Sequence, residues 1–170
     1  MVEPPGFRAF VEARSAALVR SAWLLTGDES AAEDPVQSAL VRVWPRWSRI
    51  VDDAPEAYLR KVMLSLFLSG RRRRWHGELP VADLPEVSDG RDGDSYRGVD
   101  LQQALLAGLR ALPPGQRAVL VLRYFEDASE TQTAALLGCS VGTVKSQAAR
   151  ALERLRRDPA LTGLLEVRDV

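Results

Sequence analysis

The sequence has one cysteine, Cys139, and one histidine, His76. One cysteine cannot form an internal disulfide or a cysteine metal cluster, and one histidine excludes a paired-histidine metal site. No stretch reaches the roughly 18 apolar residues of a transmembrane helix, and no basic segment leads into an apolar secretory run. Neither a Gly-rich phosphate loop nor a paired-carboxylate site is visible. We therefore expect a cytoplasmic protein that is not an enzyme, does not insert into membranes and has no catalytic residue, metal or cofactor.

The net charge of zero hides an uneven distribution of charge. Residues 1–75 carry 12 basic and 9 acidic side chains, residues 76–100 carry 2 and 7, and residues 101–157 carry 8 and 4. Two basic blocks around an acidic stretch are typical of two modules that meet a polyanion. The charge pattern thus favours a nucleic-acid partner.

Apolar residues on both sides of the acidic stretch recur at three- and four-residue spacing, which is the period of a helix. The stretch itself is rich in Pro, Gly and acids and shows no such period, so it is interpreted as a flexible linker. The predicted fold is all-α, with helical domains at 7–76 and 101–157 joined by an acidic linker at 77–100.

Three helices are expected in the first domain. The first ends at Thr26-Gly27, because glycine suits the left-handed turn that closes a helix. The second begins either at Asp28, which places Pro35 inside the helix, or at Asp34, which makes Pro35 the first helical residue. We favour a break or kink at Asp34-Pro35. The third helix runs from about Pro55 to the basic run Arg71–Arg74 and Trp75.

The second domain contains a helix-turn-helix pattern after two helices at about 101–112 and 116–125. Ser129 and Gln132 have the spacing of a capping box and open a helix over 130–137. Gly138 supplies the tight turn, and Ser140 caps a second helix over about 141–157. Ala134 is small enough for a close helix crossing, and Val144 faces inward. These offsets are those of a DNA-binding helix-turn-helix.

Polar and basic side chains occupy the outward face of this second helix: Thr143, Lys145, Ser146, Gln147 and Arg150. Short donors and long cations suit base edges and phosphates in a major groove, and Ser140 at the helix N-terminus suits a phosphate. The alternative is a structural helical hairpin with a solvated polar face. In the first domain, the run Arg71–Arg74 with Trp75 indicates either a basic ridge that binds nucleic acid or a solvated helix end.

Three segments carry a resemblance to a known family: LLTGDESAAEDPVQSALVRVWPRW (24–47), AYLRKVMLSLFLSGRRRRW (57–75) and ALPPGQRAVLVLRYFEDASETQTAALLGCSVGTVKSQAARALERLR (111–156). In this order they resemble the extracytoplasmic-function (ECF) sigma factors of bacterial RNA polymerase, in the sigma-70 family, and especially the SigE-like actinobacterial subgroup. The resemblance covers most of the chain from Phe7 to Arg157.

The resemblance implies a σ2 domain that binds core RNA polymerase and the −10 element, and a σ4 domain that reads the −35 element. The expected partners are core RNA polymerase, through its β′ clamp helices and β flap, promoter DNA and an anti-sigma factor. The matching polymerase-binding positions are Asp34, Gln37, Leu40, Val43 and Trp44. The matching −10 positions are Tyr58, Arg60, Lys61, Ser65, Arg71, Arg72, Arg73, Arg74 and Trp75. The −35 positions are those of the helix-turn-helix: Ser140, Thr143, Lys145, Ser146, Gln147 and Arg150.

The chain departs from the family pattern at five positions. The family usually has Leu at Pro35, Glu at Ser38, an aromatic at Gly70 and Glu at Gln132, and often has Asn at Ser65. These departures concern polymerase binding and promoter melting more than the fold. Two other functions therefore remain open: a degenerate sigma-like interaction protein, and a stand-alone helix-turn-helix regulator. The sequence does not identify the promoter consensus, the inducing signal or the controlling partner.

Overall fold

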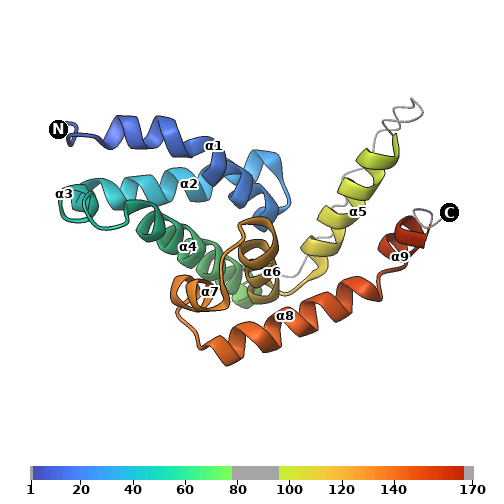
Figure 1. Ribbon diagram of the computed structural model, residues 1–170. Coiled ribbons are helices and arrows are strands. Elements are labelled where there is room, and N and C mark those ends of the chain that lie inside the picture. The colour runs from blue at the N-terminus through green and yellow to red at the C-terminus, as the bar shows by residue number, and fades with distance from the viewer. Residues whose placement is uncertain (1, 78–95, 167–170) are drawn as a thin grey trace.

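The computed structural model describes residues 2–77 and 96–166, and over these ranges it contains helices and no strand (Figure 1). The all-α prediction is therefore confirmed. Residues 78–95, most of the predicted acidic linker, lie outside the described part of the chain.

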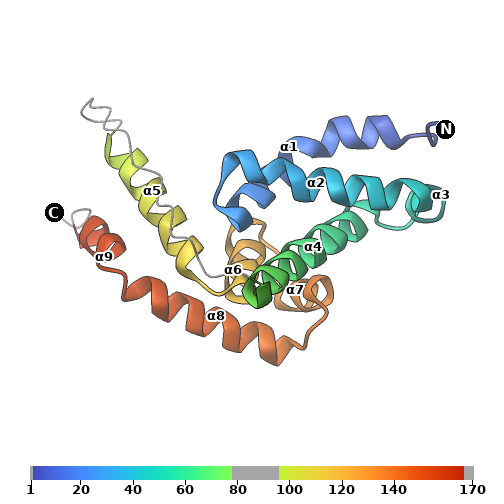
Figure 2. The same ribbon diagram turned by 180° about the vertical axis from the view of Figure 1, so that it is seen from behind.

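The first unit is built on three long helices, α1 (Phe7–Thr26), α2 (Glu29–Val43) and α4 (Pro55–Gly77). A 3-10 turn, η1 (Trp44–Arg46), and the short helix α3 (Trp47–Ile50) join α2 to α4. The helices α1 and α2 pack side by side, and α4 crosses them (Figures 1 and 2). As predicted, α1 ends at a left-handed Gly27, with φ of 72°.

The start of α2 differs from the favoured prediction. Asp28, not Asp34, caps the helix: its Oδ1 atom accepts a hydrogen bond of 2.9 Å from the Ser30 backbone N–H. Pro35 lies inside a continuous helix. An interior proline costs roughly 3 kcal/mol, because it lacks a donor and its ring crowds the preceding turn. Burial of one whole face of α2 offsets this cost, through Ala32, Val36, Ala39 and Val43.

The second unit contains α5 (Tyr96–Ala111), α6 (Pro114–Leu120), α7 (Glu130–Leu137), α8 (Val141–Arg156) and α9 (Pro159–Glu166). A π-helical turn, η2 (Val121–Phe125), extends α6 over the segment that was predicted as one helix. Helix α5 starts five residues before the predicted position 101. The sequence analysis missed α9, whose signal is Asp158-Pro159: the Asp158 carboxylate accepts a hydrogen bond of 3.0 Å from the Ala160 N–H, and Pro159 takes the first helical position.

The two units share one hydrophobic core in the described residues. Its members from the first unit include Leu25, Leu59, Met63, Leu64 and Phe67, and those from the second unit are Ala118, Val121 and Leu122. Two smaller clusters lie within the second unit and hold α8 against α5 and α6. The units therefore pack against each other through α4, α6 and α7 (Figure 2).

Candidate nucleic-acid interface

Local sequence rules produce the helix-turn-helix of α7 and α8. The Ser129 Oγ accepts a hydrogen bond of 3.0 Å from the Gln132 N–H, and the Gln132 Oε1 accepts one of 2.8 Å from the Ser129 N–H. Gly138 ends α7 with φ of 67°, in the left-handed region. Ser140 then caps α8 by accepting a hydrogen bond of 3.1 Å from the Thr143 N–H. The predicted capping box, turn and cap are all confirmed.

Apolar contacts on the inner face of α8 fix its orientation. Val144 is fully buried in a cluster with Val119 of α6 and Ala134 of α7. Ala151, about two turns further along, is buried against Leu109 of α5 and its neighbours. Because both ends of the inner face are anchored, the opposite face of α8 points away from the molecule (Figure 1).

The predicted outward residues of α8 divide into a centre and two flanks. Thr143, Ser146 and Arg150 follow at spacings of three and four, so they share the face opposite Val144, and all three are exposed. Lys145 is exposed on one flank, where its Nζ lies 3.7 Å from the Glu130 carboxylate of α7. The remaining two predicted residues are a half-buried Gln147 on the other flank and an exposed Ser140, whose hydroxyl also bonds the Thr143 hydroxyl at 2.9 Å.

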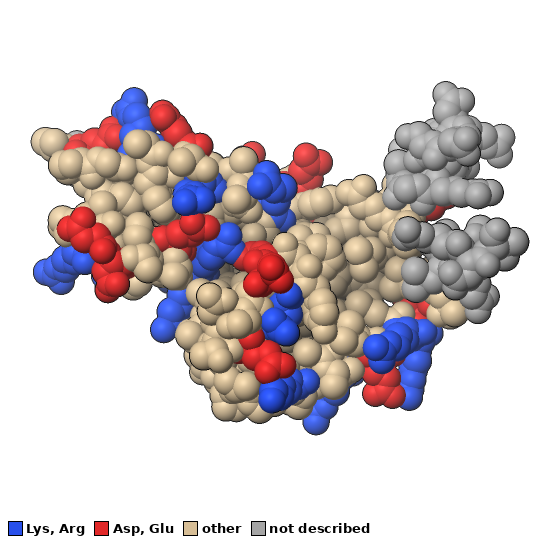
Figure 3. Space-filling view, in the orientation of Figure 1, with Lys and Arg blue, Asp and Glu red and all other residues tan. Residues whose placement is uncertain are grey.

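Charges of both signs are interspersed on the face seen in Figure 3, including along α8 at its lower edge. Glu153 pairs with Arg157 on this helix, with Oε1 and Nη2 2.6 Å apart. The positive charge on α8 therefore comes from a few individual cations rather than from a broad basic patch.

A second group of predicted residues converges on the exposed face of α4. Tyr58, Lys61 and Ser65 share this face because they are three and four residues apart. Together with Val62 and two arginines that the sequence analysis missed, Arg42 and Arg46, they line a hollow of about 260 Å³. The Tyr58 hydroxyl accepts a hydrogen bond of 3.4 Å from Arg46 Nη1. Three cations and an aromatic side chain thus surround a hollow large enough for a planar ring.

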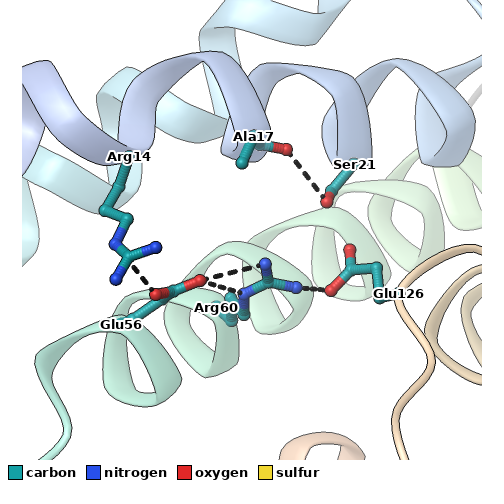
Figure 4. Close-up of polar contacts among 6 residues, drawn as sticks. All are labelled: Arg14, Ala17, Ser21, Glu56, Arg60 and Glu126. Atoms are coloured by element: carbon teal, nitrogen blue, oxygen red, sulfur yellow. Dashed lines mark hydrogen bonds and ion pairs between the residues drawn. The ribbon is translucent and has the colours of Figure 1, made fainter.

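Arg60, predicted to share this surface, lies on the other side of α4 and faces the second unit (Figure 4). Its guanidinium donates to the Glu56 carboxylate at 3.1 and 3.3 Å and pairs with Glu126, and 18% of its side chain is exposed. The structure therefore places Arg60 away from the face that carries the other predicted −10 residues Tyr58, Lys61 and Ser65. The reason is helical period, since Arg60 follows Tyr58 by two residues and points nearly the opposite way. Arg71–Arg74 and Trp75 continue α4, and their side chains lie outside the described part of the structure.

The predicted polymerase-binding positions of α2 are partly corrected. Asp34 and Gln37 are exposed, and Leu40 and Trp44 are half-buried. Val43 is fully buried in the core and is not a surface residue. Val41 was not among the predicted residues, although it is 72% exposed and lies four residues after Gln37 on the same face. Val41 follows Asp34 by seven residues, about two helical turns, and this spacing could have placed it on the exposed face from the sequence.

Val41 lies at the edge of an apolar hollow of about 520 Å³. Its other lining residues are Phe7, Leu40, Trp44 and Pro45. The Phe7 ring packs edge-on against Trp44, with centroids 4.8 Å apart, and this contact fixes the indole. An exposed valine beside a preorganised aromatic wall is typical of a protein-binding surface.

The beginning of α2 carries a perturbed carboxylate. Hydrogen bonds from the Ser30 hydroxyl and backbone N–H, with a weaker attraction from Arg110, lower the pKa of Asp28 below its ordinary value of 3.8. Asp28 is therefore ionised at neutral pH, as an N-cap at the positive end of a helix requires.

Within residues 2–77 and 96–166, no group of three His, Cys, Asp or Glu side chains is placed to hold a metal ion. None of the helices described is long and apolar enough to cross a membrane.

Two family models match this chain: "Sigma-70 region 2" over residues 10–77 and "Sigma-70, region 4" over residues 102–155. The chain is 42% identical over 165 residues to an RNA polymerase sigma-E factor of Streptomyces avermitilis, covering 96% of this chain and 87% of that protein. It is 34% identical over 156 residues to the ECF RNA polymerase sigma factor SigL of Mycobacterium tuberculosis, covering 88% and 86%.

Solved structures share the fold. The sigma factor RpoE of Bartonella quintana, crystallised with the anti-sigma factor NepR, matches with a TM-score of 0.70 and 24% identity over 96% of this chain and 99% of that one. The family models and the sigma-E relatives together decide the classification, because they cover both helical units in the same order. This chain belongs to the sigma-70 family of RNA polymerase sigma factors, and within it to the ECF sigma factors that direct the polymerase to promoters.

Proposed function

We propose that this sigma factor divides promoter recognition between two surfaces, one for duplex DNA and one for an unpaired strand. The domains of the proposal are a σ2 unit at 7–76 and a σ4 unit at 101–157. The chain performs no chemistry itself, because phosphodiester synthesis belongs to the polymerase, and it acts in the cytoplasm where the polymerase works.

The exposed centre of α8 reads the −35 duplex. Arg150 supplies a planar donor pair suited to guanine, and the Thr143 and Ser146 hydroxyls suit base edges or phosphates nearby. Lys145, Gln147 and Ser140 flank this centre and contact the phosphate backbone. Since the inner face of α8 is anchored at both ends, the helix that carries these donors is already in place before DNA binds.

The hollow on α4 captures an unpaired base of the −10 strand. The Tyr58 ring and Val62 offer apolar contact to a base, and the Ser65 hydroxyl offers a hydrogen bond to its edge. Arg42, Arg46 and Lys61 neutralise the adjoining phosphates. The run Arg71–Arg74 and Trp75 continues the same helix toward the upstream DNA.

The apolar hollow on α2 docks onto the β′ clamp helices of the core polymerase. Val41 and Trp44 form its apolar centre, and the exposed Asp34 and Gln37 precede Val41 by seven and four residues on the same face of α2. The σ4 unit is expected to contact the β flap. The structural neighbour from Bartonella quintana was crystallised with an anti-sigma factor, and we expect a partner of that kind to control this chain.

The observation that carries the polymerase-binding proposal is the exposed Val41 beside the Trp44 wall. A Val41→Asp substitution places a charge in this contact and should weaken binding to core polymerase by about tenfold or more. Val2→Asp is the matched control, because Val2 is 92% exposed and lies outside the hollow. Affinity for fluorescent core polymerase and run-off transcription from a cognate promoter are measured together.

Together with a gel shift on promoter duplex with and without core polymerase, these measurements separate the three functions considered for this chain. A sigma factor binds core polymerase and starts transcription, and Val41→Asp lowers both. A degenerate interaction protein binds the polymerase but yields no run-off product. A stand-alone regulator binds promoter duplex equally well with and without core polymerase, and Val41→Asp leaves that binding unchanged.

A further inference from the structure

The last described helix, α9, is an addition to the predicted second domain. The domain was predicted to end at residue 157, and the region 4 match ends at residue 155. Helix α9 turns back from the end of α8 and lies beside α5 in both views (Figures 1 and 2). Because it packs on α5 as well as on α8, it connects α8 to the first helix of the second unit.

A side chain of α9 makes a hydrogen bond to the end of α8. The Thr162 hydroxyl lies 3.0 Å from the Arg156 carbonyl and 3.0 Å from the Asp158 carbonyl, and both accept from it. The last four carbonyls of a helix have no partner within the helix, and the Arg156 carbonyl is one of these in α8. Helix α9 therefore supplies a hydrogen bond that α8 cannot make by itself.

An apolar contact joins α9 to both neighbouring helices. Leu161 of α9 is 6% exposed and meets α5 at Gly108. A Cβ atom added at Gly108 would lie 3.1 Å from Leu161 Cδ1 and 2.9 Å from Leu155 Cδ2 of α8. The backbone of α5 thus closely approaches one leucine from each of the other two helices. A large side chain at position 108 would displace at least one of them.

This contact lies in the same helix as the exposed residues of α8. Leu155 packs on the cluster that contains Leu109 and Ala151, and it follows Arg150 by five residues, or about 7.5 Å along the helix axis. A helix transmits a displacement over such a short distance, so a shift at Leu155 also shifts Arg150. Hydrogen bonds to base edges need donor–acceptor distances of about 2.7–3.2 Å and are lost when the donor moves by about 1 Å.

We propose that α9 acts as a brace that sets the position of α8 against α5 and thereby the accuracy of −35 reading. The brace consists of Gly108, Leu155, Leu161 and Thr162. These are positioning residues, because they act on the DNA contacts through α8. The proposal rests on the proposed function of α8 and goes beyond it, since it assigns part of the sequence preference to a helix outside the exposed face that carries Arg150.

The brace itself is tested without DNA, by hydrogen exchange on the free full chain. Thr162→Val removes the hydroxyl and keeps the volume of the side chain, and it should speed exchange in the last turn of α8 about threefold. Thr131→Val is the matched control, because Thr131 is also an exposed helical threonine but lies in α7. Equal exchange at the end of α8 in the two variants would overturn the brace.

The effect on DNA reading is tested with the holoenzyme, by competition between duplexes with intact and altered −35 elements. Gly108→Leu forces a side chain into the brace and should lower the preference for the intact element about fivefold. Gly115→Leu is the matched control, because a Cβ atom at this glycine of α6 meets nothing within 4 Å. It should keep the wild-type preference. Leu161→Ala empties the brace instead of overfilling it and should act in the same direction as Gly108→Leu.

The preference is a ratio of two affinities measured on one protein sample. A variant that merely lost folded protein would lower both affinities and leave their ratio unchanged. An unchanged ratio in both Gly108→Leu and Leu161→Ala would therefore overturn the brace and leave α9 a stabilising helix only. A wild-type holoenzyme with no preference for the intact −35 element would instead count against the proposed function of α8.

Discussion

The two surfaces that we propose to recognise the promoter are built in different ways. The α8 surface follows from residues close together in sequence: a capping box, a glycine turn, a serine cap and one polar helix face. The α4 hollow needs residues from three elements, since Arg42 comes from α2, Arg46 from η1, and Tyr58 and Ser65 from α4. The first surface therefore depends on local structure, and the second on tertiary packing.

The largest expected effect comes from disrupting the core of the first unit, on whose tertiary packing the α4 hollow depends. Trp47 is 2% exposed, packs on Phe7 and Phe10, and donates a hydrogen bond of 2.8 Å to the Pro5 carbonyl. Trp47→Ala should cost about 3–5 kcal/mol of stability and remove −10 strand binding. Hydrogen exchange should show a larger loss of protection in α4 than in α8, because the two clusters that anchor α8 contain no residue of α3 or α4. An equal loss of hydrogen-exchange protection in both units would mean that the two surfaces depend on tertiary packing to the same extent.

The next test acts on the α8 surface directly. Arg150→Ala should weaken −35 recognition by holoenzyme by about 1–3 kcal/mol if the arginine contacts a base edge. Arg156→Ala is the control, because this exposed arginine lies about 120° around the same helix. Competition between duplexes with intact and altered −35 elements gives the measurement. Equal effects of the two substitutions would show that α8 supplies charge alone.

The sequence predicted the α8 surface well because each of its signals is local. The period and the cap residues locate a helix and its outward face without knowledge of its neighbours. At Val43, Arg60 and Pro35 the local signals were not enough. Whether a residue on α2 or α4 faces solvent depends on which helix packs beside it, and whether Pro35 breaks α2 depends on how much apolar burial opposes it.

A smaller effect tests how far local hydrogen bonds, rather than tertiary contacts, stabilise the helix-turn-helix of α7 and α8. Ser129→Ala removes the hydrogen bond from the Gln132 N–H to the Ser129 hydroxyl. It should lower the free energy of unfolding by about 1 kcal/mol, with α7 fraying first. Thermal unfolding followed by circular dichroism reports the change. Ser129→Asp supplies a carboxylate acceptor and should restore most of the loss. A Ser129→Ala chain as stable as the wild type would show that tertiary contacts alone hold α7.

The smallest effect concerns the cap of α2. Because the folded pKa of Asp28 lies below 3.8, its charge stabilises the fold above that pH, and this contribution disappears as the pH falls through the lowered value. Asp28→Asn keeps an acceptor for Ser30 but has no charge to titrate. Its acid-unfolding curve should therefore be slightly flatter than that of the wild type below about pH 4. Identical curves would remove Asp28 from the acid sensitivity of the chain.

The most direct measurement of the whole account is sequencing of the RNA 5′ ends made by core polymerase on genomic DNA, with and without this chain. The account predicts discrete start sites that appear only with the chain and share two upstream elements at a fixed spacing, one of which loses its influence in the Arg150→Ala holoenzyme. Start sites that are dispersed and the same as those of core polymerase alone would contradict it.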